Sequence, residues 1–352
     1  MASPDHNMLL AYAQAQAAIE RIEERRRLSP VRHPWRTRCL IAERQALARI
    51  DGQVLDDLDI EVGARGAVST SHFDLSAARD SIGTAIGLEA LVQDGPALLR
   101  WLGQDRHPTT GGRTIGDQLM AIERWQRDAR ALPPSPPLLH SADLARLWRH
   151  HAPLGRGDLV ASLLIGDRWG PGRWDGSAGG LTAMGLERSH APWLLAQGDQ
   201  LSLLWLKAIA AGAQVQLDLE MRLRSYAKRA MGHVAGRRRP GKLKDVLLLA
   251  MARPRVTSRQ VAAALGLTSA GAIKLLTIAS DLGLLIEQSG QASYRSYAIP
   301  VSLSYSPCPP PARLKIGMRM NFGRTMGKMR PRQSLSESQQ GGVRYQSVPK
   351  SL

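Results

Sequence analysis

The residues with the greatest potential for catalysis or metal binding do not combine into a recognisable reactive site. His150 and His151 are adjacent on a predicted helix, so they point to different faces, and no second cluster of ligands accompanies them. Residues 176–180, Gly-Ser-Ala-Gly-Gly, resemble half of a phosphate-binding loop but lack the Lys and Ser/Thr that complete one. Alternating acids on an extended segment are typical of a water-facing edge, and here they are Asp56, Asp57, Asp59 and Glu61. We therefore expect no enzyme activity, no metal ion and no cofactor.

Basic charge is concentrated in the last third of the 352-residue chain. Residues 1–221 hold 24 Lys and Arg against 26 Asp and Glu, whereas residues 222–352 hold 23 against 4. Nine of these cations lie between Arg222 and Lys244 with no acid among them. Together with the net charge of +17, this pattern favours a polyanion as the partner of the C-terminal third. A solvated basic tail gives the same charge, so this alternative stays open.

Residues 242–299 carry the pattern of two paired helices followed by a hairpin. Helices are predicted at 242–252, 259–265 and 269–282, because Thr257 and Thr268 are suitable N-caps and Gly266 supplies a turn with positive φ. Two strands joined by a turn are predicted at 284–287 and 293–299. Helix, tight turn, helix and hairpin in this order are typical of a winged helix-turn-helix.

This interpretation places the second helix of the pair in the major groove of double-stranded DNA. One face of that helix remains outward and carries small or polar residues, namely Thr268, Ser269, Ala270, Ile273, Lys274 and Thr277. Base recognition would rest on Ser269, Lys274 and Thr277 and on contacts to thymine methyl groups. Four cations are placed to contact phosphates, which positions a protein without reading sequence: Lys242, Arg255, Arg259 and Arg295. Ser258 completes the predicted DNA-binding set.

The rest of the chain is predicted to be mainly α-helical, in line with its 5% of aromatic residues. Amphipathic periodicity predicts helices at 8–27, 34–50, 74–94, 117–131, 141–151 and 199–234, with a short extended piece at 60–62. The proline-rich run at 132–137 predicts a linker. We expect an N-terminal helical domain (1–132), a middle helical region (133–235), a winged helix-turn-helix (236–299) and a basic, disordered tail (300–352).

Several short motifs carry a family resemblance, among them residues 35–38 (Trp-Arg-Thr-Arg), 51–58 (Asp-Gly-Gln-Val-Leu-Asp-Asp-Leu), 264–268 (Ala-Leu-Gly-Leu-Thr) and 294–297 (Tyr-Arg-Ser-Tyr). Over residues 19–299 the chain resembles a family of uncharacterised rhizobial and other alphaproteobacterial proteins, often plasmid-encoded. Its members join a domain of unknown function to a C-terminal helix-turn-helix DNA-binding domain. The resemblance implies DNA binding and offers no known reaction. The predicted wing tip, residues 288–291, carries no cation, which weakens a phosphate contact there.

These observations favour a DNA-binding protein, either a transcriptional regulator or a plasmid-associated factor. Two alternatives remain: a winged helix that docks proteins without DNA specificity, and an unrecognised enzyme in the N-terminal part. The long helix at 199–234 is a hypothetical homodimer surface. No run of about 18 uncharged apolar residues predicts a membrane span. With two cysteines far apart, Cys39 and Cys308, we expect no disulfide framework and a cytoplasmic location.

Overall fold

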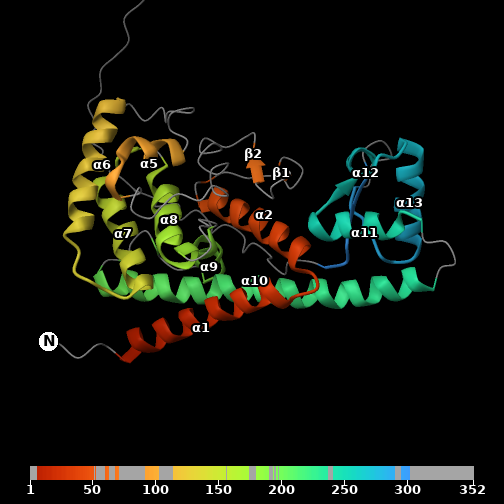
Figure 1. Cartoon of the computed structure of the whole chain (residues 1–352), viewed down its shortest axis with the longest axis horizontal. Coiled ribbons are helices and arrows are strands. Elements are labelled where there is room, and N and C mark those ends of the chain that lie inside the picture. The colour runs from red at the N-terminus through yellow and green to blue at the C-terminus, as the bar shows by residue number, and fades with distance from the viewer. Residues whose placement is uncertain are drawn as a thin grey trace, which may run out of the picture. The chain divides into compact units, whose positions relative to one another are not determined.

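The helix α10 (Gly198–Ala235) is the longest element, and α1, α2, α7, α9 and α11 all pack against it. Figure 1 shows α1 and α10 running side by side. The computed structural model describes side chains and backbone in residues 6–50, 52, 92–102, 114–155, 157–173, 180–189, 193, 196, 198–236, 241–289 and 295–301, and the backbone alone in 60–62 and 68–70. Residues 1–305 belong to one compact unit.

Eleven α-helices and five short strands make up the described part of the chain. The helices that precede α10 are α1 (His6–Leu28), α2 (Arg32–Ile50), α5 (Gly95–Trp101), α6 (Ile115–Arg130), α7 (Pro137–His151), α8 (Asp158–Trp169) and α9 (Leu181–Ser189). A short 3-10 helix, Pro171–Arg173, follows α8. The strands β1 (Ile60–Val62) and β2 (Val68–Thr70) pair antiparallel, with Ile60 opposite Thr70. The prediction of a mainly α-helical protein is confirmed.

Four helices that precede the C-terminal elements were predicted to within two residues at each end, and three others were missed. The helices predicted at 8–27, 34–50, 117–131 and 199–234 correspond to α1, α2, α6 and α10. The helix predicted from Ser141 begins earlier, at Pro137, because the first turn of a helix needs no backbone N–H from its residues. Helices α5, α8 and α9 were not predicted. The helix predicted at 74–94 lies outside the described residues up to residue 91, and the loop at 176–180 lies outside them up to residue 179.

Two glycines bring α9 and α10 into backbone contact. A Cβ atom on Gly185 would overlap the carbonyl oxygen of Ala208, and one on Gly212 would overlap the carbonyl oxygen of Leu181. Both contacts are with backbone, which cannot move aside as a side chain can. The two helices therefore require glycine at these positions, and this close crossing fixes how α9 packs on α10.

The C-terminal elements are α11 (Leu243–Ala252), β3 (Val256–Thr257), α12 (Ser258–Leu265), α13 (Ser269–Asp281), β4 (Ile286–Glu287) and β5 (Ser296–Ala298). The three strands form an antiparallel sheet in the order β3-β5-β4. Val256 lies opposite Tyr297, and Ile286 lies opposite Ala298. The helices and the two later strands were predicted, but β3 was not. Residues 290–294, between β4 and β5, and residues 302–352 are outside the described part.

Across the described residues, no single helix combines the length and apolar character needed to cross a membrane. One bent pair, α12 with α13, meets the same test by length and composition alone, and its two axes are bent by 113°.

Candidate nucleic-acid interface

The turn between α12 and α13 is built by local capping. Thr257 accepts a hydrogen bond from the backbone N–H of Gln260 at 3.3 Å, and the Gln260 side chain accepts one from the Thr257 N–H at 3.0 Å. Gly266 ends α12 in the left-handed region, with φ of +61°. Thr268 then caps α13 by accepting from the Gly271 N–H at 3.1 Å. These caps satisfy N–H groups that a helix start leaves without partners, so they fix where each helix begins.

A small aliphatic core holds the pair in place. Val261 of α12 and Ala272 and Leu276 of α13 are fully buried, together with residues of α11. Helix α10 also supports this core, because the Tyr226 hydroxyl donates to the carbonyl oxygen of Leu284 at 3.0 Å. Burial raises the pKa of Tyr226 to about 12, against the smaller lowering effects of Arg229 and Arg38. The hydroxyl therefore keeps its proton and donates at any physiological pH.

All six residues predicted to face outward on the second helix are exposed in the structure. They are Thr268, Ser269, Ala270, Ile273, Lys274 and Thr277. The residues between them, Ala272 and Leu276, face the core. The only acid on α13 is Asp281, its last residue. The outward face therefore offers hydroxyl groups, methyl groups and one ammonium group, with no carboxylate near its centre.

The residues predicted to contact phosphates differ in their exposure and in the partners that they have within the chain. Arg259 is exposed on the first turn of α12, whereas Arg255 and Ser258 are half-buried. Lys242 donates through its Nζ to the carbonyl oxygen of Leu265 at 2.7 Å, which places its charge at the C-terminal end of α12. The guanidinium Nε of Arg295 lies 3.6 Å from a carboxylate oxygen of Glu287 on β4. Lys242, Arg259 and Arg295 are all exposed, but only Arg259 of these three has no side-chain hydrogen bond or ion pair to the described residues, so it is the best suited to a phosphate contact.

A buried arginine from the N-terminal part supports this region, and sequence reasoning missed it. Arg38 of α2 donates to the carbonyl oxygens of Met251 at 2.7 Å, Ala250 at 3.1 Å and Arg253 at 2.6 Å. Only 3% of Arg38 is exposed. These carbonyl groups lie at the C-terminal end of α11, where a helix has no intrahelical donors for them and where a cation is favoured. No local signal could have revealed partners more than 200 positions away.

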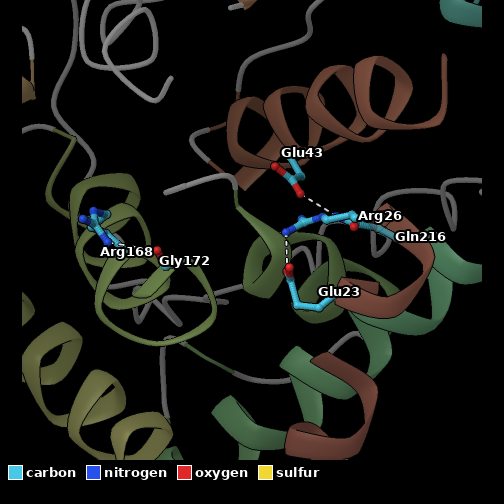
Figure 2. Close-up of polar contacts among 6 residues, drawn as sticks. All are labelled: Glu23, Arg26, Glu43, Arg168, Gly172 and Gln216. Atoms are coloured by element: carbon cyan, nitrogen blue, oxygen red, sulfur yellow. Dashed lines mark hydrogen bonds and ion pairs between the residues drawn. The ribbon is translucent and has the colours of Figure 1, made fainter. Parts of the chain in front are cut away.

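A second polar cluster lies where α1, α2 and α10 meet, with Glu43 and Gln216 buried and Glu23 and Arg26 half-buried. Figure 2 shows Glu23 and Arg26 of α1, Glu43 of α2 and Gln216 of α10 gathered together. Arg26 contacts Glu23 at 2.6 Å, and the Gln216 amide donates to the Glu43 carboxylate. Burial raises the pKa of Glu43 to about 7; Arg26 opposes the rise, and Asp167 of α8 adds to it. The Gln216 Oε1 atom finds no donor in the described parts of the chain.

Because of this raised pKa, the stability of the protein should fall as pH rises. In the unfolded chain Glu43 loses its proton near pH 4.5, whereas in the folded chain it keeps the proton until about pH 7. The contribution of the neutral carboxyl is complete below pH 4.5 and is lost as pH rises through 7, which amounts to about 3 kcal/mol at most. Glu43→Gln should therefore be more stable than the wild type at pH 8, with a flatter profile between pH 5 and 7.5. Urea unfolding at several pH values measures this.

Glu24→Gln is the matched control, because Glu24 is exposed on α1. It should leave the pH profile of the wild type unchanged. Parallel profiles for Glu43→Gln and the wild type would contradict a neutral buried Glu43.

Asp167 of α8 holds the start of α9. Its carboxylate accepts hydrogen bonds from the hydroxyl and the backbone N–H of Thr182, at the start of α9. Burial raises its pKa to about 6, and these hydrogen bonds oppose the rise. A carboxylate at this position serves as an N-cap supplied from another helix.

The remaining His, Asp and Glu side chains that could bind a metal ion do not form a metal site in the described regions. His151 lies 2.7 Å from a carboxylate oxygen of Asp128, and its ring meets that of His150 edge to face. Across the residues that the structure describes, no group of three or more His, Cys, Asp or Glu side chains is arranged to hold a metal ion. The acids at 56, 57 and 59 lie outside those residues, and only the backbone of Glu61 is described, in β1.

No protein-family model matches this sequence, and no curated protein matches it either. The resemblance to alphaproteobacterial proteins therefore stays a prediction.

Proposed function

We propose that this protein binds double-stranded DNA through a winged helix-turn-helix formed by residues 236–299, as a transcriptional regulator or plasmid-associated factor. The observation that carries the proposal is the exposed face of α13, held at 113° to α12 by a capped turn. Paired helices in DNA-binding proteins meet at about 90–120°, with the second helix in the major groove. In this proposal the antiparallel strands β4 and β5 would belong to the wing.

The composition of the exposed face supports DNA as the partner. A protein-docking face usually concentrates large apolar residues at its centre. Here the exposed set is Thr, Ser, Ala, Ile, Lys and Thr, in which Ile273 is the one large apolar side chain and the others offer hydroxyl, methyl and ammonium groups to base edges. In this proposal Lys274 contacts a guanine, and Ser269 and Thr277 exchange hydrogen bonds with bases. Arg259 is assigned to a phosphate.

The test is selection of DNA from a randomised pool by the full chain at two salt concentrations. We expect the same DNA motif to be recovered at both salt concentrations. The double change Ser269→Ala with Lys274→Ala should cost about 1–3 kcal/mol on that motif and relax its sequence. Arg259→Ala should weaken binding to all DNA sequences alike. It should also reduce by about one the slope of the logarithm of the binding constant against the logarithm of the salt concentration. Lys207→Ala is the control, because Lys207 is an exposed lysine on the first half of α10.

The outcomes separate the alternatives. Uniform weak binding that disappears with salt would leave only a polyanion-binding surface. Absence of binding would refute the proposal and redirect the search to protein partners of the same domain.

We also propose a homodimer, because two half-sites would compensate for a recognition helix with one cation. The apolar stripe of α10 is already buried against α1 and α9 within the chain. A dimer contact on this helix would therefore use its exposed side, which includes Met221 and Met231.

A further inference from the structure

The face of α13 presents methyl groups where many recognition helices present charges. Ile273 is 51% exposed, and Ala270 and Thr277 are exposed as well. The spacing of three and then four residues places all three side chains on one stripe of the helix. Lys274, the only cation of α13, lies next to this stripe.

Folding does not account for the exposed Ile273. The core of this region is made by Val261, Ala272, Leu276 and Ala279, each fully buried. Leu275 and Ile278 pack partly against that core, but Ile273 does not. A single exposed aliphatic side chain is common on protein surfaces, so what distinguishes Ile273 is its place beside Lys274 on the face proposed to meet DNA.

Only one base pair feature in the major groove is apolar, the C5-methyl group of thymine. We propose that Ala270 and Ile273 recognise thymine methyl groups, next to a guanine contacted by Lys274. This inference rests on the proposed function and specifies its substrate. From Ala270 to Thr277 the helix rises about 10 Å, which corresponds to about three base-pair steps. The preferred site therefore contains a short run with thymine at one or two defined positions.

Replacing thymine with uracil tests this directly, because uracil pairs identically and lacks the methyl group. The full chain is first used to select its motif, and each thymine of that motif is then replaced by uracil in turn. We expect about a fourfold loss of affinity at one or two positions, the factor that corresponds to about 0.8 kcal/mol for one buried methyl group. At other positions thymine and uracil should bind equally.

A variant of Ile273 tests whether this residue makes the contact to the methyl group. Ile273→Ala should lose the preference for thymine over uracil at one position. Its fold should be unchanged, because the side chain is exposed, and circular dichroism checks this. Ile115→Ala is the matched control: Ile115 at the start of α6 is also an isoleucine and is 60% exposed, and its loss should preserve the preference.

The failures are distinguishable. A chain that selects no motif overturns the proposed function and this inference with it. A chain that selects a motif but binds the thymine and uracil forms equally overturns recognition of the methyl group alone. An unchanged preference in Ile273→Ala overturns the assignment to Ile273.

Discussion

Gly212→Ala is expected to destabilise the protein by about 3 kcal/mol, whereas Gly232→Ala on the same helix is expected to stabilise it by about 0.5–1 kcal/mol. Alanine is the better helix former, so both changes gain in propensity. At Gly212 the new Cβ overlaps the Leu181 carbonyl oxygen, and α9 must move away from α10. At Gly232, which is exposed, the new Cβ has no atom within 4 Å. Urea unfolding followed by circular dichroism gives both free energies of unfolding.

The comparison holds constant the helix, the residue removed and the residue introduced. Any difference between the two variants therefore comes from the environment of the Cβ atom. Equal stabilisation of both would mean that α9 does not cross α10 at backbone contact. Destabilisation of both would mean that helix propensity does not determine the change in stability at position 232.

Local chemistry explains which parts of the fold were predictable. The predicted boundaries of α12 and α13 fall within one residue of those observed, because Thr257, Gly266 and Thr268 act on their immediate neighbours. Helix α8 has no such signal. Nearly all of its residues are buried, so it has no polar face and no amphipathic period. Strand β3 has two residues and exists through its pairing with β5, about 40 positions later.

The same distinction applies to the candidate site. The outward residues of α13 were predictable because an amphipathic helix determines its own two faces. The positions of the cations were less predictable, because their partners are distant in sequence. Lys242 contacts the carbonyl of Leu265, and Arg295 contacts Glu287. Neither partner was identified from the residue pattern, although both determine where the positive charge is held.

Arg38→Met is expected to destabilise the protein by about 3–5 kcal/mol, because it leaves three carbonyl groups at the end of α11 without their charged donor. Each hydrogen bond to a charged group contributes about 1.5–3 kcal/mol, and bonds to one guanidinium are not additive. Methionine retains most of the length and apolar contact of the side chain, so packing changes little. The loss should therefore report the polar contacts to Met251, Ala250 and Arg253. Thermal and urea unfolding measure it.

The location of the loss is as informative as its size. Arg38 joins α2 to the end of α11, the helix that precedes β3 and packs against α12 and α13. Amide hydrogen exchange in Arg38→Met should therefore accelerate first in α11, β3 and α12, with less change in α7 and α8. Arg36→Met is the control, since Arg36 is exposed on the same helix and should cost less than about 0.5 kcal/mol. If both variants unfold alike, or if exchange in Arg38→Met rises evenly over the chain, Arg38 does not couple the N-terminal helices to the candidate DNA-binding region.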